Sequence, residues 1–553
     1  MILDPVVTLT NPSASFARAW TATPMQYMAP TLIAGPMTDT QPATGEPQAV
    51  VAGQLMPDFF DEFYHRIHIK PAWIDLGNVI SNVTRQVEVW NAHFDARLLA
   101  AITPAGTIGG VTLAGQPAPP LTYGPLQSRL YTLTVSTAGD PIIDAAYAFS
   151  FGIEQPTLKV TGRRIVVWSL RPDWSSGITE RLEWLTDVLA AYDGTEQRIR
   201  LRENARRSLE MAFLLDGRAA GIADTLLSGW SGRKYCVPVW MERDVLASSV
   251  AAGATAITVT DAALKDYRVG GYVMLWRDET LAEAVEIDAI TGNTLALKVP
   301  VAASYPAGSS VCPVMIARID GEARTGRVTG RILRGRVRFI DEQAADRAPA
   351  EIGPMWQGHA VLDERPDRSE DVDESWARSL EVLDNLTGVV TVDDTTQQPI
   401  IRRTYTWLLN GRAAIDRWKK WASARAGLYT ALWLPTFGED VEVVDTIGEA
   451  ETSIKVVNTL SARYAMGTPG RVALRIESIA GQVYHRRVIG ITELDAQTEA
   501  IGIDSALGVT VSPNDIRRIM WMGLARLESD ALEIHYETDS VARIQVTFRM
   551  VRQ

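Results

Sequence analysis

The sequence is poor in the residues that build disulfide frameworks and metal sites. Its 553 residues contain two cysteines, Cys236 and Cys312, which excludes a disulfide framework and a four-cysteine zinc site. Both flank one β-rich segment and are expected on neighbouring strands, as separate buried thiols rather than a disulfide. Of the six histidines, only His65 and His68 lie close together, and no third ligand is spaced to help them. We therefore predict no metal site.

Long hydrophobic runs and excess positive charge are also missing. No apolar stretch approaches the roughly 18 residues that span a bilayer. The first 17 residues contain no Lys or Arg, so the cationic region of a signal peptide is absent. The 54 Lys and Arg against 66 Asp and Glu give a net charge of −12, which disfavours binding to a phosphate backbone. We expect a soluble chain made in a cytoplasm, with no membrane insertion and no specific grip on nucleic acid.

Signatures of catalysis are equally scarce. The sequence has no P-loop, no Rossmann glycine fingerprint and no HExxH motif, and Ser231 lacks the spacing of a nucleophile elbow. Acidic clusters at 370–374 and 438–442 suit solvated loops better than the facing carboxylates of a glycosidase. We predict no catalytic residue, no cofactor and no enzymatic activity.

The composition is that of a globular, multidomain protein with many amphipathic aromatics. The 16 Trp and 15 Tyr against 11 Phe are typical of protein contact surfaces. Prolines recur every few residues over 1–57, which denies this segment long helices and central strands. It is either a disordered tail or, as we favour, an extended arm that becomes ordered against a neighbouring subunit or tail protein.

The next segment, residues 58–163, has the alternation of a β-sandwich. Tyr131, Leu133 and Val135 alternate with polar residues, and Tyr147, Phe149 and Phe151 repeat the pattern. Turn signals separate the strands. The phrase at 89–91 resembles a strand of immunoglobulin-like modules, so we expect an immunoglobulin-like β-sandwich here.

The remaining sequence is internally duplicated at an offset of 194 residues. Arg171-Pro172-Asp173 recurs at 365–367, the block at 214–220 recurs at 408–414, and Tyr235 maps to Tyr429. Each block at 214–220 and 408–414 leads into one amphipathic helix, then a strand, Tyr235–Trp240 or Tyr429–Trp433. We expect two mainly β copies, 164–344 and 345–553, with small β-barrels inserted at about 244–313 and 440–520. The tryptophans beside these blocks, Trp168, Trp174, Trp184, Trp407, Trp418, Trp421 and Trp433, are expected to pack in cores rather than to stack on sugars.

One charged segment stands out in the first copy. The Asp193-Gly194 pair is a hairpin signal, and the preceding run, 184–192, fits a helix or a strand. We favour strand–turn–strand, with Ile199 and Leu201 facing the core and a charged stripe on the other side. Without a nearby nucleophile or base, the stripe suits a subunit contact better than catalysis. The predicted contact residues are Glu196, Arg198, Arg200, Arg202, Arg206 and Arg207.

Residues of this segment carry a family resemblance. Gly194, Glu196-Gln197-Arg198 and Arg206-Arg207, followed by 214–220 and the strand from Tyr235, resemble tail-tip proteins of long-tailed bacteriophages, and most of all the distal tail protein family. The match covers residues 194–240 alone. The second copy keeps the glycine, as Gly388, but has Val-Val-Thr-Val at 389–392. The resemblance implies tail-tube or baseplate-hub β-domains, each a barrel or sandwich flanked by a helix.

It also implies a function, namely a structural virion protein of the phage tail tip or baseplate. Such a protein forms a ring at the distal end of the tail tube, contacts the tail tube protein, and anchors the hub, the central fibre or receptor-binding proteins. The duplication slightly favours a trimer with pseudo-sixfold symmetry over a hexamer. Two rival functions are a tail-associated cell-wall hydrolase and an adhesin that binds host-surface glycans. We expect the protein in the virion tail, after synthesis in the host bacterial cytoplasm.

Overall fold

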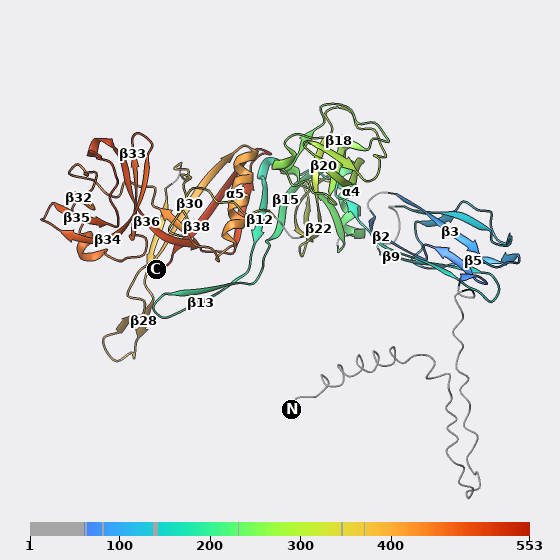
Figure 1. Cartoon of the computed structure of the whole chain (residues 1–553), viewed down its shortest axis with the longest axis horizontal. Coiled ribbons are helices and arrows are strands. Elements are labelled where there is room, and N and C mark those ends of the chain that lie inside the picture. The colour runs from blue at the N-terminus through green and yellow to red at the C-terminus, as the bar shows by residue number, and fades with distance from the viewer. Residues whose placement is uncertain are drawn as a thin grey trace, which may run out of the picture. The chain divides into compact units, whose positions relative to one another are not determined.

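The computed structural model describes residue 60 and residues 63–79, 82–136, 142–230, 232–343, 347–369 and 371–552. The arm expected over 1–57 lies outside these residues. The described part is mainly β, as predicted (Figure 1). Its α-helices are α4 (Gly217–Trp230), α5 (Arg412–Arg425) and α6 (Ser461–Tyr464). None of the described helices is long and apolar enough to cross a membrane.

The first β-domain consists of two four-stranded sheets around one hydrophobic core. Tyr131, Leu133 and Val135 are buried on one strand while the residues between them are half-buried, so the alternation in the sequence is realised. The first sheet contains, in order, β1 (Ile67–Lys70), β3 (Val83–Asn91), β8 (Ser128–Val135) and β6 (Val111–Ala114). The second contains β2 (Trp73–Val79), β10 (Thr157–Arg164), β9 (Ile142–Ser150) and β5 (Ala101–Gly106). A ribbon of β4 (Arg97–Leu99) and β7 (Leu121–Tyr123) completes the domain.

Residues 165–343, here called the first half, form a β-domain with one helix. Its strands are β11 (Val166–Val167), β12 (Ile178–Glu183), β15 (Arg206–Asp216), β16 (Lys234–Pro238), β22 (Ser310–Ile319), β23 (Arg324–Arg327) and β24 (Ile332–Asp341). Helix α4 buries Ala220 and Ala223, and Ile222, Leu226 and Trp230 pack beside them on the core. A hairpin of β13 (Thr186–Ala190) and β14 (Glu196–Arg200) lies between β12 and β15, as the Asp-Gly signal predicts.

An excursion between β16 and β22 has a hydrophobic core of its own. That core runs from Leu246 to Val311. The strands of the excursion are β17 (Asp244–Val245), β18 (Ala256–Thr258), β19 (Tyr272–Asp278), β20 (Leu281–Thr291) and β21 (Thr294–Leu297). They are hydrogen-bonded in the order β18-β21-β20-β19-β22. The inserted segment can therefore fold around its own apolar side chains.

Residues 347–552, here called the second half, contain short and long strands, a hairpin and helix α5. The strands are β25 (Met355–Trp356), β26 (His359–Ala360), β27 (Asp373–Ala377), β30 (Ile400–Asn410), β31 (Leu432–Pro435), β36 (Ile516–Leu527), β37 (Ala531–Tyr536) and β38 (Val541–Met550). A hairpin of β28 (Leu380–Leu383) and β29 (Thr391–Asp394) lies between β27 and β30. Helix α5 buries Ile415, Trp418 and Trp421.

The second half also contains an excursion with a separate core, from Ile447 to Trp521. Its strands are β32 (Ser453–Val457), β33 (Ala473–Ser478), β34 (Val483–Glu493) and β35 (Thr498–Ile503). They are hydrogen-bonded in the order β32-β35-β34-β33-β36.

The tryptophans follow the sequence prediction, whereas one predicted strand begins later than expected. The tryptophans are packed inside, with Trp168, Trp184, Trp407, Trp418, Trp421 and Trp433 buried and Trp174 partly buried against the core. The strand expected from Tyr429 is wrong at its start, because β31 begins at Leu432. Tyr429 lies before it and is exposed, whereas Tyr235 is fully buried on β16.

A close approach of two backbones in the second half gives a test of the fold. A Cβ on Gly523 of β36 would lie 2.3 Å from the Cα of Gly470. We expect Gly523→Ala to lower the free energy of unfolding by about 1–3 kcal/mol, because the backbone must shift to relieve the overlap. Gly490→Ala on β34 is the matched control, since no atom lies within 4 Å of its added Cβ. Chemical denaturation of both variants measures the difference, and equal midpoints would contradict this packing.

Candidate assembly interface

The two halves share one continuous network of hydrogen-bonded strands. Strand β12 of the first half pairs with β15 on one side and with β37 of the second half on the other. The β12–β37 register runs from Ile178 opposite Tyr536 to Glu183 opposite Ala531. Strand β12 therefore lies between a strand of the first half and a strand of the second (Figure 1). We call this pairing, with the side chains packed around it, the inter-half joint.

Buried side chains alternate with more exposed ones along both strands of the joint. Ile178 and Leu182 on β12 are buried, as are Leu532 and Ile534 on β37. These side chains belong to one core cluster that includes residues of both halves. Apolar burial of this kind is the main source of stability for an interface inside a chain, at about 25 cal/mol per Å² of apolar surface.

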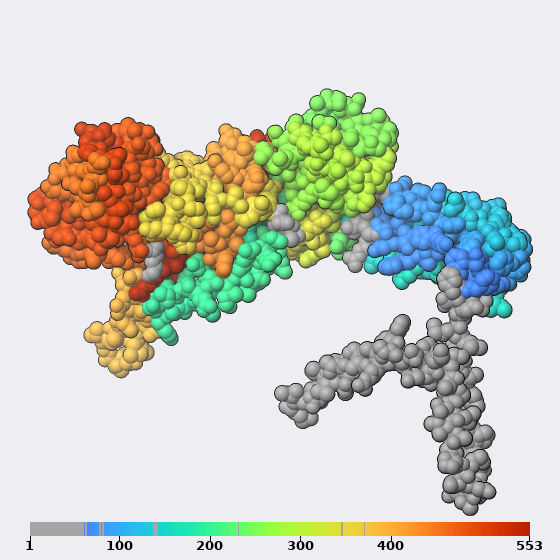
Figure 2. Space-filling model, in the orientation of Figure 1, coloured from blue at the N-terminus to red at the C-terminus, as the bar shows by residue number. Residues whose placement is uncertain are grey.

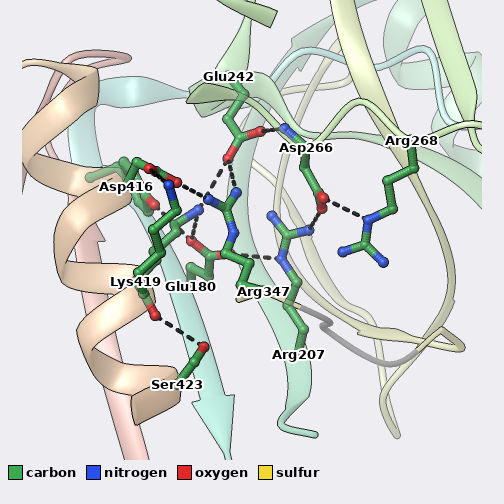
Figure 3. A network of polar contacts seen from close by, with 11 residues as sticks. Glu180, Arg207, Glu242, Asp266, Arg268, Arg347, Asp416, Lys419 and Ser423 are labelled. Carbon is green, nitrogen blue, oxygen red and sulfur yellow. Dashed lines mark hydrogen bonds and ion pairs between the residues drawn. The ribbon is translucent and has the colours of Figure 1, made fainter. Parts of the chain in front are cut away.

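A charged residue, Glu180, occupies the central inward position of β12. Its carboxylate accepts a hydrogen bond from Arg207 Nε at 2.6 Å and forms an ion pair with Lys419 Nζ at 2.7 Å (Figure 3). The hydroxyl of Tyr536 donates a third hydrogen bond to it at 2.7 Å. Arg207 lies on β15 of the first half, whereas Lys419 and Tyr536 lie on α5 and β37 of the second.

More charged groups surround Glu180 and connect it to the first excursion. Lys419 Nζ lies 3.1 Å from Glu242 Oε1, and Arg207 Nη1 lies 2.7 Å from Asp266 Oδ2. Arg347, at the start of the second half, contacts both Glu242 and Asp416 (Figure 3). We call these residues, with Glu180, the ion cluster. Its carboxylates and cations come from both halves and from the first excursion.

The ion cluster lowers the pKa of two of its carboxyl groups, those of Glu180 and Glu242. Burial on its own would raise the pKa of Glu180, but Arg207 and Lys419 outweigh it and hold that pKa well below its ordinary value of 4.5. The same balance, with Lys419 and Arg347 as the cations, lowers the pKa of Glu242. Burial and the neighbouring Glu180 carboxylate raise the pKa of the Tyr536 hydroxyl, which therefore stays a hydrogen-bond donor.

The packing and pairing of these charged groups support a structural role for the ion cluster. The space among Glu180, Arg207, Asp266, Arg347 and Lys419 has a volume of about 10 Å³, no more than a single water requires. Each of its carboxylates already pairs with a cation. Buried charges that are paired and hydrogen-bonded resist separation, because breaking one pair leaves the other charge stranded. The ion cluster thus fixes how the halves meet.

The hairpin predicted from the charged stripe also lies on the second half. Glu196 on β14 accepts two hydrogen bonds from the guanidinium of Arg526 on β36, at 2.7 and 2.9 Å, and Arg549 on β38 lies 3.6 Å away. The side chains of Glu196 and Arg526 are buried. Burial raises the pKa of Glu196, but the hydrogen bonds from Arg526 outweigh this and leave it lowered. Glu196 therefore has its charged partners within its own chain.

The other predicted contact residues are spread over several environments. Arg198 donates to the backbone oxygen of Leu428 at 3.4 Å, and Arg207 belongs to the ion cluster. Arg200 and Arg202 donate to backbone oxygens at the base of the hairpin. Arg206 is exposed on β15. Whether any of them meets another subunit stays a prediction.

The predicted orientation of the apolar residues on this hairpin is wrong. Ile199 and Leu201 are 41% and 59% exposed instead of facing a core. The two strands form a separate two-stranded sheet, and the side of β14 that contacts the second half is the side with Glu196 and Arg198. Alternation is therefore preserved, with the charged residues turned inward and the apolar ones outward.

The other candidates from the sequence show no site chemistry in the described residues. Cys236 and Cys312 are buried free thiols on the adjacent strands β16 and β22, and burial raises the pKa of each. The ring of His68 stacks on Trp90, and that of His65 packs against Phe94. Within the described ranges, no group of three or more potential ligands could hold a metal ion.

Sequence reasoning missed most of the ion cluster. Arg207 was singled out for another role, whereas Glu180, Glu242, Arg347 and Lys419 were not considered. One signal was available, because Lys419 lies beside Trp418 on the apolar face of a helix, where a cation needs a buried partner.

Comparison with protein-family models and with curated proteins returns no match to this chain.

The ion cluster predicts a sharp contrast between two adjacent lysines. Lys419 is 2% exposed between two carboxylates, whereas Lys420 is 37% exposed beside Asp416. We expect Lys419→Met to lower the free energy of unfolding by about 3–5 kcal/mol, since it strands buried charge. The control, Lys420→Met, should change it by less than about 1 kcal/mol. Denaturant titrations of the two variants measure this contrast, and similar losses would argue against a buried cluster.

Acid should weaken the joint in a defined direction. Glu180 and Glu242 have depressed pKa values in the folded chain, so they stabilise it above their ordinary value of 4.5 and lose this contribution as pH falls further. The melting temperature should therefore drop between pH 5 and pH 3. A Glu180→Gln variant, already destabilised at pH 7, should lose less over that interval. Parallel slopes for the two proteins would show that Glu180 is not part of the acid response.

Proposed function

We propose that this protein is a ring-forming structural component of a phage tail tip or baseplate. In this role it assembles at the distal end of the tail tube, contacts the tail tube protein, and anchors the hub, central fibre or receptor-binding proteins. The observation that carries the proposal is the inter-half joint, in which two β-domains of similar build are linked edge to edge. The family resemblance of residues 194–240 supports the same assignment.

The first support is the order of strands in the two halves. The first half runs β18-β21-β20-β19-β22-β16, and the second runs β32-β35-β34-β33-β36-β31. Likewise β12-β15-β24 in the first half matches β27-β30-β38 in the second. Shared order over nine strands in each half favours one fold used twice, as the internal repeats in the sequence predict.

The second support is register. Residues 179 and 373, at the offset of 194, occupy equivalent places opposite Glu210 and Thr404. The bulge between Ile287 and Ala289 has a counterpart between Val488 and Gly490. Bulges are fixed features of a fold, so the match is informative. After the helix the offset grows to 197, with Leu432 in the place of Tyr235, because the second connection is longer.

The joint then shows how such halves associate. Edge strand β12 of the first half meets edge strand β37 of the second. A contact between two different surfaces of one repeated unit is head-to-tail, and repeating it closes a ring if the rotation permits. Three chains would supply six similar β-domains, which suits a threefold ring that presents a pseudo-sixfold face to a tail tube. We assign the first β-domain, with its two four-stranded sheets, as immunoglobulin-like.

The experiment that tests this function is mass photometry of the purified chain together with negative-stain imaging. We expect annular particles of about 182 kDa, three times the 60.7 kDa of one chain. Annular particles near six chains would keep the ring and overturn the trimer. Particles that stay at one chain over the whole concentration range, with binding to glycans or release of peptidoglycan fragments, would overturn the structural role in favour of an adhesin or a hydrolase.

A further inference from the structure

We propose that strand β27 of one chain adds to strand β23 of a second copy, which repeats between chains the pairing that β12 and β37 make within one. The inference rests on the proposed function, since it names the surface through which the assembly forms. By the correspondence of the halves, β27 is the counterpart of β12, and β23 is the counterpart of β37. The joint thus uses β12 of the first half and β37 of the second, which leaves their counterparts, β27 and β23, without a partner half.

Both of these edges are open. Every residue of β27, Asp373–Ala377, is exposed, and so is every residue of β23, Arg324–Arg327. Among the described residues, β27 pairs with β30 alone and β23 with β24 alone. An open groove of about 750 Å³ runs beside β23 and is lined in part by Arg324, Thr325, Gly326 and Arg327. An unpaired strand edge is a template for another strand.

The inter-half joint fixes the register of the inferred pairing. Within the chain, Arg181 lies opposite Glu533 and Leu182 lies opposite Leu532. The counterparts are Ser375 for Arg181 and Arg324 for Glu533, taken from the matching ladders of each half. Ser375 of one chain should therefore lie opposite Arg324 of the next.

The side chains at the apolar position complement each other in size. Leu182 is buried against Leu532 in the inter-half joint. In the inferred pairing the counterpart of Leu182 is Trp376, and the counterpart of Leu532 is Ala323. Trp376 is 63% exposed, and Ala323 is partly buried at the rim of the core. A large aromatic beside a small residue keeps the contact filled, and buried tryptophans often dominate binding energy.

The two edges also carry opposite charge. The β27 edge is acidic, with Asp371, Asp373 and Glu374, whereas the β23 edge is basic. The basic residues on and after β23 are Arg324, Arg327, Arg331, Arg334 and Arg336. Arg327 stands at the position of Tyr536, and Glu374 stands at that of Glu180, which accepts a hydrogen bond from Tyr536. Glu374 already pairs with Arg403 on β30 at 2.9 Å. Arg327 is expected to add a second cation to this carboxylate across the contact, and opposite charges speed docking.

The hairpin β28–β29 extends the same surface. It occupies the place in the second half that β13–β14 occupies in the first, and its register keeps the offset of 194. It stands out from the surrounding surface (Figure 2). Its exposed apolar side chains are Leu380, Val382, Leu383, Leu386, Val389, Val390 and Val392. By analogy with β13–β14, it should lie on the first half of the next chain, where apolar contact replaces the Glu196–Arg526 pair.

Cross-linking in the full chain tests the register directly. Ser375→Cys combined with Arg324→Cys should be joined between chains by a short bismaleimide, giving products of up to three chains in a closed trimer. A mixture of the two single variants should give two-chain products only. The native cysteines are fully buried and do not compete. The control pair, Ser375→Cys with Ser228→Cys on the exposed face of α4, should give none.

A second variant keeps the test independent of cysteine chemistry. Trp376→Ala should raise the concentration for half-assembly at least tenfold while the far-ultraviolet circular dichroism stays unchanged. The matched control is Tyr464→Ala, which removes a 79% exposed aromatic from α6 and should not alter assembly. Particles of ring mass with no Ser375–Arg324 cross-link and no effect of Trp376→Ala would overturn this interface but leave the proposed function standing. A chain that never assembles would overturn both.

Discussion

The pairing of β12 with β37 is the interaction on which the rest of the structure depends. It merges two β-domains into one network of 22 strands and brings their cores into one cluster. Backbone hydrogen bonds alone would allow the strands to slide by two residues without changing which side chains face inward. The ion cluster removes that freedom, because Glu180 reaches Arg207, Lys419 and Tyr536 together in a single register. Charge buried at the joint therefore contributes geometry more than net stability.

The same constraint explains the character of the free edges. A long apolar edge strand would aggregate with any other sheet, and natural proteins prevent this with charge and short length. Strand β23 has four residues with an arginine at each end, and β27 has five that begin with two acids. Each edge thus repels its own kind and attracts the other, which favours head-to-tail contact over edge-to-edge dimers of like strands.

Local patterns in the sequence were sufficient for much of the fold. Period-two alternation located β8 and β9, and the stripe of apolar residues located α4 and α5, because each signal depends on neighbours in the chain. The Asp193-Gly194 turn gave the hairpin for the same reason. Two inferences failed where tertiary structure decides. Tyr429 was placed in a strand by extending a fixed offset across a connection whose length differs, and Ile199 was placed in a core that the detached hairpin does not have.

The ion cluster was beyond such reasoning, because its members come from β12, β15, η2 (Trp240–Glu242), the loop that contains Asp266, the start of the second half at Arg347, and α5. No local pattern in the sequence indicates that Glu180 contacts a lysine on a helix of the other half. Only the placement of Lys419 on an apolar helix face was visible, and it shows a need for a partner without naming it. Sequence alone therefore predicts the strands and the helix of the joint but not the contacts between them.

The joint within the chain and the contact inferred between chains face different physical demands, and their residues differ accordingly. The tether between the halves keeps β12 and β37 at a high effective concentration, so the joint can form although its charges must lose their water. Strand β27 must find β23 by diffusion, where exposed opposite charges accelerate encounter and an exposed Trp376 supplies the apolar anchor. One repeated fold would thus require buried charge where two copies are fused in a single chain. It would require exposed charge where copies in separate chains must meet in solution.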